Sequence, residues 1–168
     1  IQDLEIIDRA TLKRMEPNIE GVAALNVPTA AIACPYTLNI ALAESSAAAG
    51  VVFMLETPVT GIRGEQGAFE LTTPSGVVSS SLIVNSAGLF ADKVARMVGV
   101  TRWRIWPCRG EYLILDKAKG DLVNSMVYPV PPKEGAGLGI HITPTTDGNI
   151  ILGPSADYTS DGDDVRTT

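Results

Sequence analysis

The chain has 168 residues, of which 45% are hydrophobic and 19% are charged, and its formal net charge at pH 7 is -6. This composition is that of a globular protein and excludes a disordered one. The negative charge and the lack of a basic run argue against a nucleic-acid or anionic-membrane partner, and no apolar run approaches the ~20 residues that span a bilayer.

Cysteine and histidine usage narrows the chemistry further. Cys34 and Cys108 lie far apart and match no metal or redox spacing, so we expect reduced thiols and a cytoplasmic protein. The acidic, mixed N-terminal residues do not form a signal peptide. A single histidine excludes a multi-histidine metal site, so we expect no metal.

Two helices are predicted in the first fifty residues. Asp8 is a capping residue ahead of "RATLKRM", and Pro17 ends that helix. Pro35 suits the first turn of the second helix, and Gly50 suits its end. Between the helices, residues 22–34 are apolar but interrupted by proline, which predicts a short strand or an extended loop.

Strands follow. The run "VVFMLE" (51–56) predicts a buried strand, and two glycine-bearing turns divide the next segment into a three-stranded antiparallel meander. Its third strand ends in the apolar run 82–84, which is followed by the tight turn "NSAG" (85–88) and a helix with apolar residues at Phe90 and Val94. Small residues at such a turn let another group approach the backbone closely. Plain packing of helix on strand explains the pattern too and is favoured on spacing alone, because the glycines of G-x-G-x-x-G are missing.

The chain becomes β-rich after residue 100. Four strand candidates lie in "RWRIWPCRGEYLILD", "SMVYPVP", "GLGIHIT" and "NIILG", with no convincing helix, and Asp147-Gly148 predicts a hairpin turn between the last two. The sequence therefore predicts an α+β fold, with a helix-plus-meander part at about 35–99 and a β-rich part from about 100 to 154.

One strand of the β-rich part carries a candidate catalytic residue. Leu138, Ile140 and Ile142 share one face, which we expect in the core, while His141 shares the other face with Gly139. A neutral histidine can accept a proton near pH 7 and so suits the ionisation of an alcohol. A structural histidine, facing solvent or hydrogen-bonded, is the equally open alternative.

The segment "PCRGEYLILD" offers a candidate anion-binding residue. Arg109 and Glu111 lie on one side of the predicted strand and Tyr112 lies on the other. An arginine can bind a carboxylate or phosphate in bidentate geometry. A surface charge or a structural ion pair, for example with Glu111, is the more frequent role.

Several motifs in this order resemble one family. They are "EPNI", "VPTAAIACPYTLNIALAESSAAAGV", "VNSAGLFADKVA", "RGEYLILDK", "YPVPP" and "LGIHITPTTDGNIILGPSA", and together they cover about residues 5–158. They resemble FAD-dependent oxidoreductases of the glycine oxidase/D-amino-acid oxidase type, and most of all the bacterial glycerol-3-phosphate dehydrogenase-like and L-2-hydroxyglutarate oxidase-like proteins.

The resemblance implies a cofactor and a domain division. It implies FAD in the full-length protein, with Val59, Ala87 and Gly88 as cofactor contacts. The β-rich part resembles the substrate domain that covers the flavin. The implied ranges are 1–34 and 100–155 for the substrate domain, 35–99 for a partial FAD-binding domain, and 156–168 for a linker.

The resemblance also implies an activity. It implies oxidation of a small hydroxy substrate such as glycerol 3-phosphate by hydride transfer to FAD, with His141 as base or hydrogen-bond donor, Arg109 as anion clamp and Tyr112 as a wall of the pocket. The alternatives are oxidation of L-2-hydroxyglutarate, oxidation of an amine or amino acid, and a non-catalytic binding domain. The expected partners are a small-molecule substrate and an unidentified electron acceptor. The expected location is the cytoplasm, and peripheral association with a membrane through the electron acceptor is the alternative.

The family's glycine-rich diphosphate loop and its C-terminal flavin segment have no counterpart in this sequence. We therefore expect an internal fragment of a larger enzyme, which alone would be inactive and would not bind FAD tightly. We also expect exposed apolar surface around residues 51–55 and 82–84, which would favour self-association.

Overall fold

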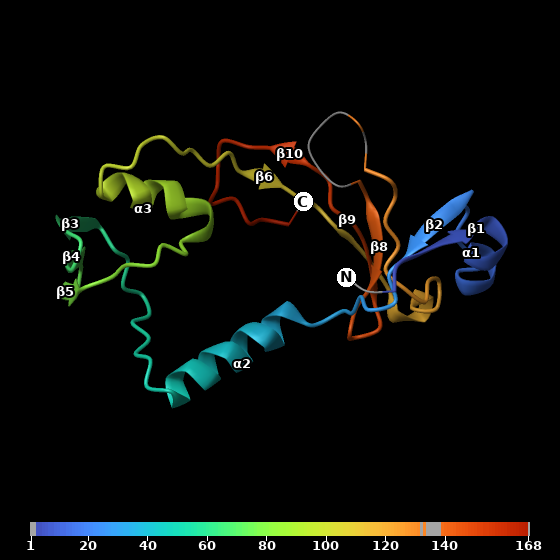
Figure 1. The fold of residues 1–168 in the computed structure, drawn as a ribbon, viewed down its shortest axis with the longest axis horizontal. Helices are drawn as coiled ribbons and strands as arrows, with labels where there is room; N and C mark the ends of the chain where they lie inside the picture. The colour runs from blue at the N-terminus through green and yellow to red at the C-terminus, as the bar shows by residue number, and fades with distance from the viewer. Residues whose placement is uncertain (1–2, 132, 134–138, 168) are drawn as a thin grey trace. The chain divides into compact units, whose positions relative to one another are not determined.

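The computed structural model describes residues 3–131, 133 and 139–167 (Figure 1). The chain forms two compact units, one of Ile1–Ser46 with Arg109–Asp157 and the other of Ala47–Cys108 with Tyr158–Thr168. The chain thus passes between these units at 46/47, 108/109 and 157/158. The assignment of substrate and FAD-binding roles to these ranges remains a prediction.

The first unit begins with a small strand–helix–strand layer. Strands β1 (Glu5–Asp8) and β2 (Ala23–Asn26) pair antiparallel, and helix α1 (Arg9–Met15) connects them (Figure 1). The carboxylate of Asp8 accepts a hydrogen bond of 2.8 Å from the amide of Thr11, which confirms the predicted cap. Ile7 and Leu12 are buried here.

Helix α2 (Pro35–Ala48) confirms the second predicted helix. Its end has the expected chemistry: Gly50 has φ +91°, and its amide donates to the carbonyl of Ala47 at 2.9 Å.

A three-stranded antiparallel sheet forms the centre of the first unit. Its strands are β7 (Leu113–Leu115), β8 (His141–Pro144) and β9 (Ile150–Gly153), in the order β7-β9-β8. The hairpin of β8 and β9 is labelled in Figure 1. The hairpin between β8 and β9 turns at Gly148, which has φ +89°, so the predicted turn is confirmed. Ile150 on the central strand is fully buried.

The predicted core face of β8 is wrong in part. The side chain of Ile140 is 65% exposed, and Ile142 is only half-buried. The strand begins at His141, so the alternation that would turn Ile140 inward does not extend to that residue. Leu138 lies outside the described residues.

Short elements complete the β-rich part. Strands β6 (Cys108–Arg109) and β10 (Asp157–Tyr158) form a two-stranded sheet, and η2 (Lys117–Lys119) is a single 3-10 turn. The predicted strand in "SMVYPVP" is reduced to one antiparallel bridge between Val127 and Ile142.

The second unit contains the predicted meander. Strands β3 (Gly61–Glu65), β4 (Ala68–Thr73) and β5 (Gly76–Ser80) form an antiparallel sheet in chain order (Figure 1). It is followed by the 3-10 turn η1 (Gly88–Phe90) and helix α3 (Ala91–Met97), so the helix predicted after "NSAG" is confirmed. The prediction of an α+β fold is likewise confirmed.

Two predicted strands in this unit are wrong. Residues 51–56 and 82–84 have no strand conformation, because no described strand pairs with either run. A β-branched run forms a strand only when a neighbour satisfies its backbone. The expected apolar exposure is present: Val52 and Leu55 are 82% and 81% exposed, and Leu82 is 73% exposed.

Among the residues that the structure describes, no helix combines the length and the apolar character that a bilayer span requires.

Candidate functional site

One face of the β7-β9-β8 sheet brings together His141 and Tyr112, whereas Arg109 lies on β6, which pairs with β10 in a separate sheet. His141 at the start of β8 is the direct cross-strand partner of Gly153 at the end of β9. On the other side of β9, Leu113 pairs with Leu152, so the preceding residue, Tyr112, lies opposite Gly153. A Cβ added at Gly153 would lie 2.7 Å from Cδ1 of Tyr112, which shows that the tyrosine ring leans over the bare glycine backbone. Tyr112 and His141 therefore flank Gly153 on one face.

A second aromatic side chain borders His141. The ring of Tyr128 lies with its centroid 4.5 Å from that of His141, at an interplanar angle of 46°. The hydroxyl of Tyr128 donates a hydrogen bond to the sulfur of Met126 at 3.7 Å. Sequence reasoning missed Tyr128, because its contact with His141 depends on the Val127–Ile142 bridge and not on any local spacing.

The imidazole of His141 has an unusual environment. Its Nε2 atom is buried and has no hydrogen-bond partner among the described residues. Buried polar atoms in native proteins nearly always have a partner. This nitrogen is therefore suited to a group supplied from outside the described chain, such as a substrate oxygen.

Arg109 and Glu111 form the ion pair that the sequence allows as the structural alternative. The distance between Nε of Arg109 and Oε1 of Glu111 is 3.2 Å, and both side chains are about 40% exposed. The amide of Glu111 also donates to the hydroxyl of Ser155 at 3.1 Å. Glu111 thus offsets the charge of Arg109 at the position of the expected anion clamp.

The three residues expected to contact the cofactor all lie in the second unit. Val59 is half-buried just before β3, and Ala87 is half-buried at the start of η1. Asn85 shapes the turn: its side-chain oxygen accepts from the amide of Ala87 at 3.3 Å, and its side-chain nitrogen donates to the carbonyl of Ala91 at 2.8 Å. Gly88 has φ +53° and open space where a side chain would be, so the turn presents bare backbone there.

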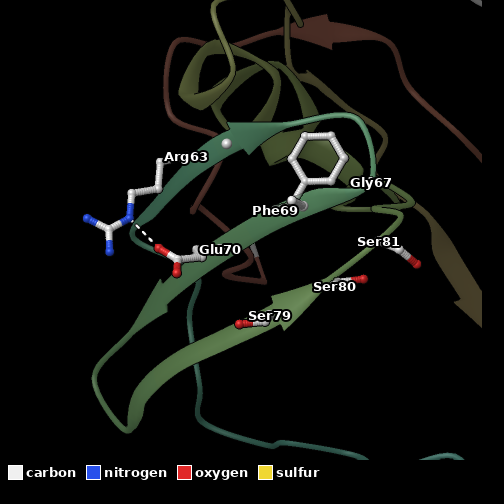
Figure 2. Close-up of a pocket in the computed structure, with 9 residues that line it drawn as sticks. Arg63, Gly67, Phe69, Glu70, Ser79, Ser80 and Ser81 are labelled. Carbon is white, nitrogen blue, oxygen red and sulfur yellow. Dashed lines mark hydrogen bonds and ion pairs between the residues drawn. The ribbon is translucent and has the colours of Figure 1, made fainter.

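The meander carries a concavity of about 570 Å³, shown in Figure 2. Arg63 on β3 and Glu70 on β4 form an ion pair at its wall, and Phe69, Ser79, Ser80 and Ser81 also line it. Because Glu70 neutralises Arg63, this concavity is a poor anion site. None of the three expected cofactor residues lines it.

A second concavity of about 550 Å³ lies between the meander and α3 and is mostly apolar. Ile62, Phe69, Ile83, Val94 and Val98 line it, together with Asn85 from the turn before Ala87. It is adjacent to the exposed run at 82–84, so it belongs to the apolar surface that the sequence predicts in this unit.

The described cysteines and acidic side chains form neither a disulfide bond nor a metal site. Cys34 and Cys108 are free thiols, and hydrogen bonds from Thr37 lower the pKa of Cys34. In the described ranges, no group of three or more histidine, cysteine or acidic side chains could hold a metal ion.

Comparison with known proteins gives one family. The model of the FAD dependent oxidoreductase family, DAO, matches residues 1–168. The chain is 34% identical to a glycerol 3-phosphate dehydrogenase from Caloramator mitchellensis over 170 residues, covering 100% of this chain and 35% of that protein. It is 30% identical to an L-2-hydroxyglutarate dehydrogenase from Escherichia coli over 154 residues, covering 90% of this chain and 36% of that protein.

Solved structures give the same fold. A glycine oxidase from Bacillus cereus superposes with a TM-score of 0.77 at 21% identity, covering 95% of this chain and 42% of that chain. The chain thus spans about a third of the length of these curated relatives, and both the glycerol 3-phosphate and the L-2-hydroxyglutarate enzymes match it at comparable identity.

Proposed function

Because the chain belongs to the DAO family of FAD-dependent oxidoreductases, we propose that it is part of a longer flavin-dependent dehydrogenase or oxidase that oxidises a small hydroxy substrate. Glycerol 3-phosphate is the first candidate substrate, since a glycerol 3-phosphate dehydrogenase matches the whole chain at 34% identity. The single observation that carries a catalytic role for this part is the buried, unpartnered Nε2 of His141 among the described residues.

His141 acts as the base in this proposal. The substrate hydroxyl gives its proton to Nε2 as the carbon–oxygen double bond forms. FAD, when bound, supplies the acceptor for the hydride that leaves the same carbon. In this proposal, Tyr112 and the bare backbone of Gly153 form the wall of the substrate site beside the imidazole.

Arg109 acts as the anion clamp for the substrate phosphate or carboxylate. A guanidinium carries five N–H donors, so its pair with Glu111 at Nε is compatible with an added anion. The ion pair also weakens substrate binding, because the substrate anion must compete with the Glu111 carboxylate, which already offsets the charge of Arg109.

The second unit contributes backbone to the cofactor site in this proposal. The left-handed Gly88 and the half-buried Ala87 and Val59 fit a group that packs closely on main chain. These residues carry no charged side chain, so we assign the diphosphate contacts to parts of the longer protein. We further propose a cytoplasmic location, with peripheral membrane association through the electron acceptor as the alternative.

The test uses the full-length protein. Purified protein should show flavin absorbance and should reduce an artificial electron acceptor with one member of a panel of glycerol 3-phosphate, L-2-hydroxyglutarate and amino acids. The substrate that turns over decides between hydroxy and amine oxidation. A colourless protein that does not take up added FAD would favour a non-catalytic binding domain.

The role of His141 has its own test. In the full-length protein, His141→Ala should lower kcat by about 10²–10⁴-fold, which is the usual contribution of a positioned base. Thr143→Ala, two residues along the same strand, is the matched control and should retain kcat. A His141→Ala enzyme with normal turnover would remove the base assignment while leaving the flavin chemistry intact.

A further inference from the structure

A catalytic imidazole needs a fixed orientation, and in proteins a hydrogen bond to one ring nitrogen commonly supplies it. At His141 the described residues offer Nε2 no such bond. The imidazole instead packs against the ring of Tyr128, at a centroid distance of 4.5 Å.

We propose that Tyr128 is a positioning residue that fixes the orientation of the His141 imidazole through ring packing. This inference rests on the proposed role of His141 and deepens it, because it names what holds the base in place. Three features of the structure support it: the backbone register, the ring geometry and the absence of a side chain at Gly153.

The backbone register brings the two rings together. The amide of Val127 donates to the carbonyl of Ile142 at 2.8 Å, and the amide of Ile142 donates back to the carbonyl of Val127 at 3.0 Å. In an antiparallel ladder the next residues, Tyr128 and His141, form a non-hydrogen-bonded pair, in which opposing side chains approach most closely. Two backbone bonds therefore aim the tyrosine ring at the imidazole.

The ring geometry suits packing and not hydrogen bonding. A centroid distance of 4.5 Å with a tilt of 46° falls at the close end of the usual range for aromatic pairs. The Tyr128 hydroxyl is engaged with Met126 and not with the imidazole. The ring face, rather than the hydroxyl, is therefore the part of Tyr128 that acts on His141.

The opposite side of the imidazole receives no side chain from its own cross-strand partner. That partner on β9 is Gly153, and the next side chain across the sheet is Tyr112, whose ring leans over the Gly153 backbone. If Tyr128 is shortened, the imidazole loses its ring contact at 4.5 Å, and Gly153 has no side chain to replace it. Its Nε2 would then sample orientations away from the substrate oxygen.

The first test uses this chain. It contains one histidine, so labelled protein gives one set of imidazole resonances. Tyr128→Leu should shift these resonances, because the ring current of the tyrosine is lost. Tyr128→Phe should leave them nearly unchanged, and Tyr36→Leu, at an exposed position on α2, is the control. Identical imidazole resonances in the Tyr128→Leu variant and the wild type would overturn the proposed contact.

The second test uses the full-length enzyme. Tyr128→Leu should lower kcat by roughly 10-fold or more with little change in KM, as outer-shell residues that orient a reactive group do. Tyr128→Phe, which keeps the ring, should have the kcat of the wild type. A Tyr128→Leu variant with wild-type kcat, in an enzyme that His141→Ala impairs, would overturn the positioning role. If His141→Ala itself retains turnover, the base assignment and the positioning role both fail.

Discussion

The lack of a side chain at Gly153 determines the packing of the sheet face around His141. A Cβ at this position would lie 2.6 Å from the carbonyl oxygen of Glu111 and 2.7 Å from the ring of Tyr112. Both distances are shorter than van der Waals contact, and one partner is backbone, so the neighbours cannot simply rotate away. Glycine is therefore required for Tyr112 to stand beside His141.

This requirement gives a prediction at the residue scale. Gly153→Ala should lower the free energy of unfolding by about 1–3 kcal/mol, as overpacking of a filled site does. Gly61→Ala is the matched control, since its Cβ would meet nothing closer than Thr72 at 3.7 Å. Urea unfolding of the two variants and the wild type measures the difference. Equal stability of the Gly153→Ala and wild-type proteins would contradict this account of the sheet face.

Single residues also show what the sequence can and cannot predict. The Asp8 cap and the Gly148 turn were predictable, because each acts within a few residues of itself. Glu16 was not: it is 4% exposed, and its carboxylate accepts from the amide of Asn124 at 2.8 Å across 108 positions of sequence. The pairing of Tyr128 with His141 was hidden for the same reason.

Among the elements, helix α3 is anchored by a buried carboxylate. Asp92 in its first turn binds Arg96 at 2.7 Å and the amide of Ile105 at 3.3 Å. Burial by itself would raise the pKa of Asp92, but the Ile105 hydrogen bond and the Arg96 charge outweigh it, so the pKa is lowered. The carboxylate thereby ties the helix to the segment that follows it.

The lowered pKa gives a pH prediction. Because the pKa of Asp92 is lower in the folded than in the unfolded state, its contribution to stability is complete above the unfolded value of about 4 and is lost as pH falls through the folded value. Asp92→Asn should therefore be less stable than wild type at pH 7, with a difference that narrows at lower pH. Glu65→Gln, at an exposed position on β3, is the control. Urea unfolding across a pH series measures the difference, and one that is constant or grows as the pH falls would contradict the assignment.

The strands show where prediction from sequence stops. The meander and the β8–β9 hairpin were predictable, because each strand lies next to its partner in sequence. The runs 51–56 and 82–84 are apolar and contain β-branched residues, yet no described strand pairs with them. Composition indicates that a segment can form a strand, whereas pairing depends on a neighbour that composition does not reveal.

At the scale of the whole molecule, the two units carry different parts of the proposed chemistry. His141, Arg109 and Tyr112, proposed to act on the substrate, lie in one unit, and Val59, Ala87 and Gly88, proposed to contact the cofactor, lie in the other. The family was predictable from the sequence, because its motifs follow one another in order. The substrate was not predictable, since a glycerol 3-phosphate dehydrogenase and an L-2-hydroxyglutarate dehydrogenase match the chain at 34% and 30% identity.

This division predicts that the chain alone binds FAD weakly. The cofactor-side residues offer no charged side chain to the diphosphate, and the loss of two or three charge-assisted hydrogen bonds at about 1.5–3 kcal/mol each weakens binding by several orders of magnitude. A fluorescence titration should therefore show weak binding of FAD, similar to that of riboflavin, which lacks the diphosphate. Saturable binding of FAD at low micromolar concentration would contradict this expectation.

We propose that this chain works within a flavin-dependent oxidoreductase of small hydroxy substrates. The most direct measurement is anaerobic mixing of the purified full-length protein with glycerol 3-phosphate and, separately, with L-2-hydroxyglutarate, while the flavin absorbance is followed. The account predicts bleaching of the flavin by one of the two substrates and slower bleaching in the His141→Ala variant. A flavin that neither substrate bleaches, or a protein that holds no flavin, would contradict it.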